Sequence, residues 1–262
     1  MKKINLIILL SAVCIFYVSC KGLHHLNSDE LASNKADSLD IYLLIGQSNM
    51  AGRAPIEEQD KDTLRNVYLF TGNAKKQWEK AANPLNAYSS VRKRLELQKL
   101  NPGYTFAKKI ALKSKRPIGL VVNAKGGTKI ELWAPGTDFF NEAVARTKEA
   151  MKNGRLKGII WHQGEANSSK YKQYMPQITA LIKALRTEFN QADLPFVAGQ
   201  LSADKEARKD FNKMILTLPQ ELDCVGVVTS EKTSTIDKTH FDSGSQREMG
   251  RRYAKEMIKL LH

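Results

Sequence analysis

Short apolar runs alternate with longer amphipathic stretches along most of this 262-residue chain. The runs are rich in β-branched and other large apolar residues and are bounded by polar or turn-forming residues, a pattern typical of buried strands. They span residues 41–45, 67–70, 118–122, 158–161, 196–199 and 225–228. Strands that alternate with helices predict a mostly parallel sheet covered on both faces. The expected fold class is therefore α/β, a three-layer αβα sandwich.

Two helical segments are clear from their spacing. Apolar residues recur every three to four positions between residues 178 and 189, and again between 249 and 261. The stretch 71–103 shows no sustained period, so we expect a long, partly ordered loop there that borders the functional site.

Polar and glycine-containing segments follow the predicted strands. In an open parallel sheet the ligand crevice lies at the carboxyl ends of the strands. Residues that follow different strands are therefore expected to meet at one edge of the sheet. These residues are Ser48, Gly126, Gly127, Gln163, Glu165, Gln200, Asp237 and His240.

The first predicted strand runs directly into the turn Gly46-Gln-Ser-Asn-Met-Ala-Gly52. A serine at the end of a rigid strand acts as a nucleophile when a base lies within reach and N–H groups face the developing oxyanion. Ser48 is the candidate. The alternative is that these residues form an ordinary turn between a strand and a helix, with Ser or Asn as the helix cap. His240, with Asp237 three residues before it, supplies a base and an orienting carboxylate, which favours the catalytic interpretation.

Four blocks together resemble the SGNH hydrolases, and within them the carbohydrate acetylesterases that include sialate O-acetylesterases and family 6 acetylxylan esterases. Their order and spacing extend over nearly the whole chain from about residue 40, so the resemblance is more specific than a single motif. It implies a flavodoxin-like sandwich and one esterase domain over 40–262. The blocks are Gly46 to Gly52, Gly126-Gly-Thr128 with Trp133 after it, His162-Gln-Gly-Glu165, and Asp237-Lys-Thr-His240-Phe.

The resemblance implies a serine esterase that removes O-acetyl groups from carbohydrate through an acyl-enzyme, without metal or cofactor. Ser48 would be the nucleophile, His240 the general base and Asp237 its orienting residue. Another SGNH esterase, a lipase, a thioesterase and a non-catalytic carbohydrate-binding lipoprotein are the alternatives. An α/β-hydrolase is disfavoured, because its Gly-x-Ser-x-Gly elbow would need glycine at Met50.

The resemblance also implies an oxyanion hole. It would combine the backbone N–H of Ser48, a backbone N–H from Gly126 or Gly127, and a side-chain amide. The family is named for an Asn in that place, whereas the block in this chain offers Gln163, which we assign as the amide donor.

Further residues are expected to support the triad or to bind substrate. Glu165 could support His240, bind a sugar hydroxyl or organise its own loop, and Arg53 could reach the substrate or pair with Glu165. Trp133 and Trp161 could offer aromatic faces for a sugar ring, with buried packing an equal alternative for Trp161, which ends a strand. The remaining candidates are Gln47, Asn49 and Gln200.

Residues 1–19 have the plan of a bacterial secretory signal, with two lysines before an apolar run. The following Cys20 resembles the lipidated cysteine of a lipobox, although Tyr17 stands where Leu is usual. A plain signal peptide cleaved nearby is the alternative. Residues 20–39 are mostly polar and predict a tether between lipid and domain. We expect an extracytoplasmic protein, anchored to a membrane on the periplasmic side or at the cell surface.

Charge and composition narrow the expected partners. The formal net charge is +14, and loss of residues 1–19, with two lysines and no acidic residue, would leave +12. The basic residues are dispersed and form no nucleic-acid-binding motif, so an acetylated oligo- or polysaccharide is the expected partner and nucleic acid is not. No metal-ligand spacing is evident, and Cys224 has no expected disulfide partner.

Overall fold

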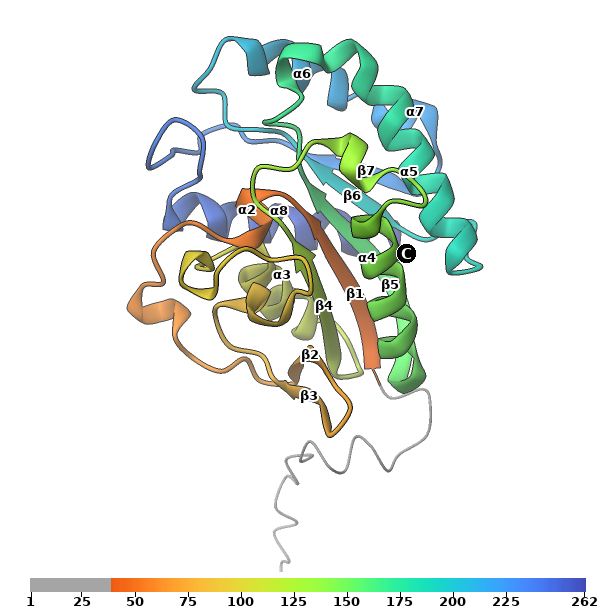
Figure 1. Cartoon of the computed structure of the whole chain (residues 1–262). Helices are drawn as coiled ribbons and strands as arrows, with labels where there is room; N and C mark the ends of the chain where they lie inside the picture. The colour runs from red at the N-terminus through yellow and green to blue at the C-terminus, as the bar shows by residue number, and fades with distance from the viewer. Residues whose placement is uncertain (1–38) are drawn as a thin grey trace, which may run out of the picture.

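The computed structural model describes residues 39–262. These residues form one seven-stranded sheet between two helical layers (Figure 1). The predicted signal peptide, the lipidation site Cys20 and the predicted tether up to residue 38 lie outside the described residues. Leu39 begins the first strand, one residue before the expected start of the domain.

The sheet confirms the predicted fold class. Its order is β3-β2-β4-β1-β5-β6-β7, with β3 antiparallel to β2 and the other neighbouring strands parallel. All six predicted strands are present, and most extend a few residues further than expected. The strands are β1 (Leu39–Gly46), β2 (Val67–Asn73), β3 (Lys76–Lys80), β4 (Ile118–Ala124), β5 (Gly154–His162), β6 (Phe196–Gly199) and β7 (Val225–Val228).

The strand β3 corrects the prediction of a long loop over 71–103. It is an edge strand with charged side chains, and Trp78 is its one residue that is buried in the core. The indole Nε1 of Trp78 donates a hydrogen bond to Oδ1 of Asn153 at 3.0 Å. A single buried residue in a charged strand gives too weak an alternation to be recognised from the sequence.

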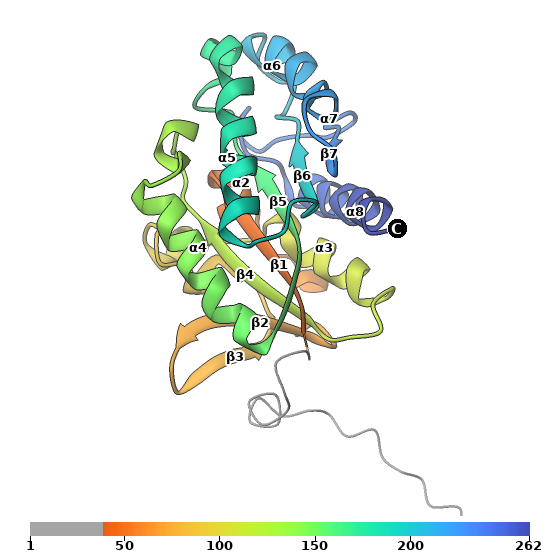
Figure 2. The ribbon, with the colours of Figure 1, turned by 90° about the vertical axis from the view of Figure 1, so that its right-hand side faces the viewer.

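The helices lie in two layers. In Figure 2, α4 and α5 cover one face of the sheet, and α3 and α8 cover the other. No helix within residues 39–262 is both long enough and apolar enough to cross a membrane. The α-helices are α2 (Ser48–Ala51), α3 (Pro102–Ala111), α4 (Asp138–Ala150), α5 (Tyr174–Glu188), α6 (Ala207–Ile215), α7 (Leu218–Glu221) and α8 (Ser243–Leu260). The 3₁₀ helices are η1 (Glu58–Asp60), η2 (Leu85–Tyr88), η3 (Leu95–Leu97), η4 (Ile130–Trp133), η5 (Met151–Asn153) and η6 (Ser168–Gln173).

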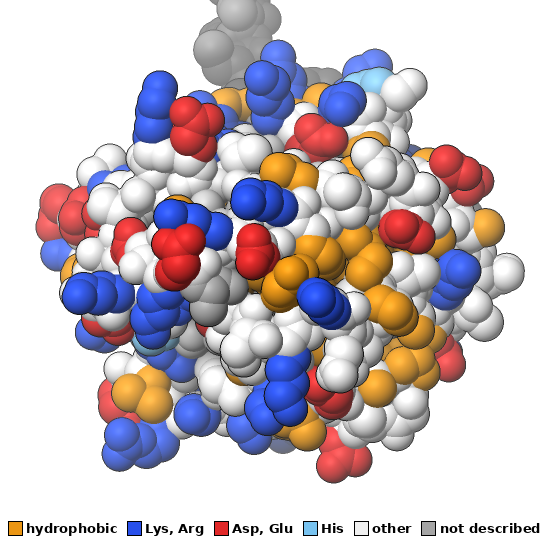
Figure 3. All heavy atoms as spheres, turned by 90° about the horizontal axis from the view of Figure 1, so that it is seen from above, with side chains coloured by type: hydrophobic (Ala, Val, Ile, Leu, Met, Phe, Trp, Pro, Cys, Tyr) orange, Lys and Arg blue, Asp and Glu red, His pale blue; other side chains and the backbone are white. Residues whose placement is uncertain are grey.

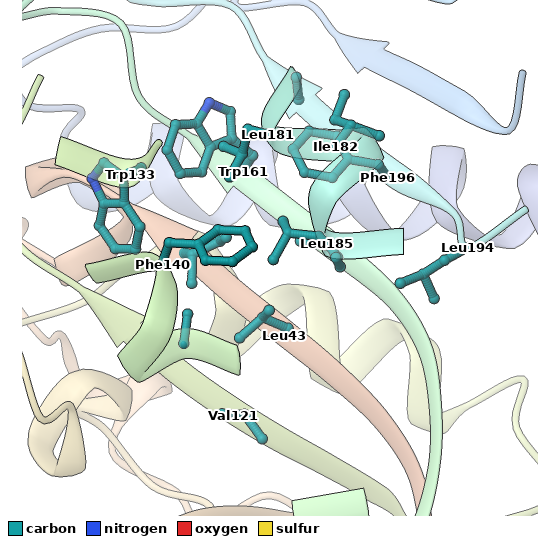
Figure 4. Packing of buried hydrophobic residues seen from close by; sticks show 14 of the residues in the cluster. Leu43, Val121, Trp133, Phe140, Trp161, Leu181, Ile182, Leu185, Leu194 and Phe196 are labelled. Carbon is teal, nitrogen blue, oxygen red and sulfur yellow. The ribbon is translucent and has the colours of Figure 1, made fainter. Parts of the chain in front are cut away.

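Alternate residues of the central strands belong to two separate cores. In β1, Leu43 packs into the core beneath α4 and α5, and Leu44 packs into the core beneath α3 and α8. Figure 4 shows the first core, where Leu43 and Val121 of the sheet meet side chains such as Leu185. Each large apolar side chain buried in this way contributes roughly 1.5–3 kcal/mol. Because both faces of the sheet are packed, the positions of the carboxyl ends of its strands are fixed.

The side chains of Asn101 and Asp242 cap the first turns of α3 and α8. Oδ1 of Asn101 accepts from the N–H of Gly103 at 2.9 Å and caps α3, while its Nδ2 donates to the carbonyl of Met50 in α2. Oδ1 of Asp242 accepts from the N–H of Ser245 at 2.7 Å and caps α8. Such caps stabilise a helix by about 1 kcal/mol each. Both lie next to segments that carry candidate catalytic residues.

Candidate active site

The turn after β1 holds Ser48 at the end of the strand. Gly46 has φ +139°, and a Cβ at this position would overlap the backbone carbonyl of His162. The N–H of Gln47 donates to that same carbonyl at 2.9 Å. Glycine is therefore needed for β1 to turn sharply into α2, which begins at Ser48 and lies at the upper end of β1 in Figure 1.

Ser48, His240 and Asp237 form one hydrogen-bonded line. Nε2 of His240 lies 2.9 Å from Oγ of Ser48, and Nδ1 lies 2.6 Å from Oδ2 of Asp237. An ionised carboxylate can only accept, so Nδ1 carries the hydrogen and Nε2 accepts the hydroxyl hydrogen of Ser48. This is the nucleophile, base and orienter arrangement that the sequence predicted.

The segment Ile236 to Phe241 is named here the catalytic turn. Oδ1 of Asp237 accepts from the N–H groups of Thr239 and His240, at 3.0 and 2.8 Å. The N–H of Ile236 donates to the carbonyl of His240 at 2.9 Å. The two oxygens of Asp237 thus have separate tasks, since one shapes the turn and the other orients the imidazole.

The charge on Asp237 is stabilised by these same contacts. Partial burial on its own would raise the pKa of this carboxyl group. The backbone N–H of His240, its imidazole and the N–H of Thr239 outweigh that effect and lower the pKa of Asp237 below its ordinary value of 3.8. Asp237 is therefore ionised at neutral pH.

Gly126 brings a second backbone segment beside the nucleophile. A Cβ on Gly126 would stand 3.3 Å from Cβ of Ser48 and would overlap the guanidinium of Arg53. The N–H of Lys125 donates to the carbonyl of Gly46 at 3.1 Å, which ties the segment after β4 to the turn after β1. The predicted oxyanion residues Ser48 and Gly126 are thus neighbours, and Gly127 follows with φ +77°.

The amide of Gln163 is turned into the protein. Its Nε2 donates to Oε1 of Gln47 at 3.1 Å, to the carbonyl of Thr128 at 3.0 Å and to Oδ1 of Asn167 at 2.8 Å. Its Oε1 accepts from the hydroxyl of Tyr174 at 2.8 Å. Gln163 is 1% exposed, and three acceptors share its two amide hydrogens. In this arrangement the side chain holds the loops together, and the assignment of Gln163 as an oxyanion donor stays a prediction.

Glu165 is buried behind the triad. Its Oε1 accepts from Nδ2 of Asn49 at 2.6 Å and lies 3.7 Å from Nε2 of His162. Burial lowers the pKa of His162, an effect that Glu165 partly opposes. Asn49 also donates from Nδ2 to the carbonyl of Thr239 at 3.1 Å. Glu165 therefore acts on the catalytic turn through Asn49, and Asp237 is the residue that orients the imidazole.

Two cationic side chains flank the Gly126–Gly127 segment. Nη1 of Arg53 donates to the carbonyls of Gly52 and Leu97, at 2.6 and 3.0 Å, and its Nη2 end lies against Gly126. Partial burial lowers the pKa of Arg53. Lys93, which the sequence did not single out, reaches the same place with Nζ 3.7 Å from where a Cβ of Gly127 would stand. The stretch 71–103 thus borders the site as expected.

Trp133 does not offer a face to a sugar. It is 0% exposed, its Nε1 donates to Oγ1 of Thr128 at 3.0 Å, and it packs edge-to-face on Trp161 with ring centroids 5.5 Å apart. Figure 4 shows both indoles inside the core. The predicted role in substrate stacking is wrong, because burial leaves no face of the ring accessible.

The amides of Gln47 and Gln200 connect loops around the site. Oε1 of Gln47 accepts from the N–H of Ala166 at 3.4 Å as well as from Gln163. Nε2 of Gln200 donates to the carbonyl of Asn212 at 3.0 Å, and its Oε1 accepts from the N–H of Ser230 at 3.0 Å. These contacts agree with a supporting role.

Arg208 is a residue near the site that the sequence analysis missed. It is 2% exposed and donates from Nη1 to the carbonyl of Lys238 and from Nη2 to Oγ1 of Thr239, at 2.9 and 3.1 Å. Arg208 lies in a segment of mostly charged residues, so its neighbours in the sequence do not indicate that it is buried. The available signal is its spacing of three residues from Phe211, which places it on the buried side of α6.

The sheet edge that carries the site has mixed charge. Figure 3 looks down on this end of the molecule, where lysine and arginine side chains are interspersed with acidic ones. Among residues 39–262, no three His, Cys, Asp or Glu side chains are grouped so that they could hold a metal ion.

An open, mostly parallel αβα sandwich thus presents a Ser-His-Asp line at the carboxyl ends of its strands. A family described as carbohydrate esterase, sialic acid-specific acetylesterase matches residues 38–259. The chain belongs to that carbohydrate esterase family.

Relatives and solved structures agree with this placement. The chain is 31% identical over 176 residues to the probable carbohydrate esterase At4g34215 of Arabidopsis thaliana, a match that spans 60% of this chain and 66% of the plant protein. The crystal structure of At4g34215 superposes with a TM-score of 0.77 at 26% identity, over 85% of this chain and 98% of that chain. XAC1771, a carbohydrate acetylesterase of Xanthomonas citri, shares the fold with a TM-score of 0.63 at 23% identity, over 83% and 55% of the two chains.

Proposed function

We propose that this protein is a serine esterase that removes O-acetyl groups from carbohydrate through an acyl-enzyme. The observation that carries the proposal is the line from Oγ of Ser48 through the imidazole of His240 to Oδ2 of Asp237, with distances of 2.9 and 2.6 Å. Membership of the carbohydrate esterase family supports the choice of substrate class.

The first half of the reaction forms the acyl-enzyme. Oγ of Ser48 attacks the carbonyl carbon of the acetyl ester while its proton passes to Nε2 of His240. Asp237 holds the imidazole in the required tautomer and stabilises the imidazolium that results. The tetrahedral intermediate then expels the sugar oxygen, which takes the proton from Nε2 and leaves as a hydroxyl group.

The negative charge of the intermediate needs hydrogen-bond donors. The N–H of Ser48 starts α2, and the first N–H groups of a helix have no partner within the helix. The segment Gly126–Gly127 stands beside Ser48 and can add a second backbone donor. One donor of this kind stabilises the transition state by about 3 kcal/mol.

The second half of the reaction regenerates the enzyme. Nε2 of His240 takes a proton from water, and the resulting hydroxide attacks the acetyl group on Ser48. The tetrahedral intermediate expels Oγ, which takes the proton back from His240, and acetic acid leaves and ionises in solution. Every step uses the same three side chains and the same oxyanion donors, so no metal or cofactor is needed.

The cations near the site support an acetylated sugar that also carries a carboxylate. Arg53 and Lys93 flank the Gly126–Gly127 segment, and the guanidinium of Arg53 donates to the backbone carbonyls of Gly52 and Leu97. A guanidinium in that setting binds a carboxylate with paired N–H groups. Acetylated sialic acid or an acetylated uronate-containing polymer would satisfy both the ester chemistry and the charge.

Release of acetate from a panel of acetylated substrates tests the proposed function. The panel consists of acetylated xylan, pectin, sialic acid and peptidoglycan, each assayed with and without EDTA. We expect acetate from at least one of them, unaffected by EDTA and absent in the Ser48→Ala variant. Hydrolysis of long-chain esters without acetate release would support the lipase alternative. Loss of activity with EDTA, restored by zinc, would contradict the serine mechanism.

We further propose that the protein is held at a membrane by lipid on Cys20. The basic start, the apolar run and Ser19-Cys20 support this proposal. Two or more acyl chains make such an anchor stable, and the polar segment after Cys20 would let the esterase domain reach polymeric substrate. A palmitate analogue should label the wild-type protein and not the Cys20→Ser variant. An unlabelled wild-type protein would contradict the anchor.

A further inference from the structure

The catalytic turn stands at the surface and is not fixed in place by its own hydrogen bonds. The side chain of Asp237 is 50% exposed, and Lys238 next to it has φ +61°, in the left-handed region that non-glycine residues rarely adopt. The hydrogen bonds within the turn set its shape. They do not set the distance between His240 and Ser48, which lies on a different loop.

Two buried side chains connect the catalytic turn to the rest of the protein. Asn49, next to the nucleophile, donates to the carbonyl of Thr239 and accepts from the N–H of Phe241, both at 3.1 Å. Arg208 donates to the carbonyl of Lys238 at 2.9 Å and to Oγ1 of Thr239 at 3.1 Å. The turn is therefore held from one side by α2 and from the other by α6.

A buried carboxylate lies next to the first of these anchors. Oε1 of Glu165 accepts the hydrogen bond from Asn49 at 2.6 Å. Burial lowers the pKa of Arg208, and Glu165 is the neighbouring charge that opposes this effect most strongly. Within residues 39–262, Oε2 of Glu165 and Nε of Arg208 are both buried without a hydrogen-bond partner. The negative charge of Glu165 therefore favours the charged form of Arg208, as do the charges of Asp204 and Asp237.

We propose that Arg208 is a positioning residue of the esterase reaction, which sets the register of His240 against Ser48. The inference rests on the proposed function. Arg208 contacts Lys238, Thr239 and the hydroxyl of Ser202, so it acts on the reaction only through the catalytic turn.

The size of the expected effect follows from the geometry of proton transfer. A shift of about 1 Å in a catalytic group costs roughly 100-fold in rate. Substrate contacts near Arg53 are left in place when Arg208 changes. Loss of Arg208 should therefore reduce kcat and leave KM nearly unchanged, whereas simple loss of folded protein would reduce the amount of active enzyme without slowing the molecules that remain.

Arg186 provides a matched control. It is a partly buried arginine that also donates to backbone carbonyls, those of Leu194, Asp223 and Cys224, at the amino ends of β6 and β7. That edge of the sheet is opposite to the site. The variants are Arg208→Gln, Arg208→Lys and Arg186→Gln, each measured for kcat and KM on 4-nitrophenyl acetate, for melting temperature, and for the labelling rate of Ser48 by a serine-directed phosphonate.

We expect Arg208→Gln to lower kcat and the labelling rate by about 100-fold, with KM within about twofold of wild type. Arg208→Lys should recover part of that loss, because it keeps a positive charge and a donor beside the catalytic turn but cannot make both hydrogen bonds. Arg186→Gln should lower the melting temperature and keep kcat per folded molecule.

Thr239→Val tests the same idea with a variant that preserves shape. Thr239 is partly exposed, and the substitution removes the Oγ1 that accepts from Arg208. Loss of this one hydrogen bond should lower kcat by about fivefold. In the double variant with Arg208→Gln the fivefold loss should disappear, since the two changes remove the same interaction.

Two outcomes would overturn the inference: kcat of Arg208→Gln within threefold of wild type, or equal losses of kcat in Arg208→Gln and Arg186→Gln. Additive losses in the double variant would also contradict it. A different result bears on the proposed function. If wild-type protein neither hydrolyses acetyl esters nor reacts with the phosphonate at Ser48, the proposed function is wrong, and the inference that rests on it is wrong as well.

Discussion

Nε2 of His240 lies 2.9 Å from Oγ of Ser48, although 192 positions separate the two residues in the sequence. The contact joins the turn after β1 to the catalytic turn before α8. Asn49, the residue after the nucleophile, maintains it by bonding to both Thr239 and Phe241. The nucleophile and the base are thus aligned by a neighbour of the nucleophile itself.

Substitutions in the triad should differ in severity. His240→Ala removes the base and should lower kcat by at least about 10³-fold, whereas Asp237→Asn keeps the imidazole and should leave a higher residual rate. Glu165→Gln should cost less than Asp237→Asn, because Glu165 reaches the catalytic turn through Asn49. The measurement is kcat on 4-nitrophenyl acetate. A larger loss in Glu165→Gln than in Asp237→Asn would assign the orienting role to Glu165.

The lowered pKa of Asp237 predicts how its contribution to stability depends on pH. A carboxyl group whose pKa is depressed by folding stabilises the protein fully above its ordinary value of 3.8 and loses that effect as pH falls through the lower folded value. The melting temperature of wild type should therefore exceed that of Asp237→Asn at pH 6, and the difference should shrink toward pH 3. A difference that grows with acidification would contradict the assignment of charge to Asp237.

Arg53 and Lys93 should discriminate between charged and neutral substrates. Arg53→Gln should lower kcat/KM for an acetylated sugar with a carboxylate by about tenfold more than for a neutral acetyl ester, since it removes a charge-assisted hydrogen bond. Lys93→Gln should have a smaller effect in the same direction. Arg94→Gln is the control, because Arg94 is exposed and already pairs with Glu96 at 3.0 Å. Equal losses on both substrates would argue against a carboxylate site.

Gly46 should be irreplaceable for the turn that presents Ser48. Gly46→Ala combines a positive φ with a Cβ that overlaps the backbone carbonyl of His162, so we expect a loss of more than about 3 kcal/mol in the free energy of unfolding. Gly136→Ala is the control. Gly136 has φ +85° and no atom within 4 Å of the added Cβ, so its cost should be about 1 kcal/mol. Denaturant unfolding of both variants measures the difference, and equal losses would contradict the close approach at Gly46.

The sequence predicted the sheet and the triad because both leave short local signals. Buried parallel strands appear in the sequence as apolar runs. Ser48 lies directly after one such run, and Asp237 and His240 lie three residues apart in one block. The edge strand β3 leaves one buried residue, Trp78, and was missed.

Side-chain direction and long-range pairing could not be predicted in the same way. Gln163 follows a strand as expected, yet its amide points into the core, because the three acceptors that hold it come from other segments. Trp133 is predicted from its motif to offer a face to a sugar ring, but contacts such as that with Trp161 bury it. Arg208 meets the catalytic turn 30 positions away, a contact that only the folded chain defines.

The covalent intermediate on Ser48 tests the central proposal most directly. Wild type and Ser48→Ala are mixed with 4-nitrophenyl acetate, quenched in acid, and digested for mass spectrometry, with the release of 4-nitrophenol followed in parallel. We predict an acetyl group on the wild-type peptide that contains Ser48, and none at this position in the variant, whose turnover should fall by at least about 10³-fold while its melting temperature stays close to wild type. Wild-type turnover in Ser48→Ala, or an acetyl group trapped on a different residue, would contradict the account.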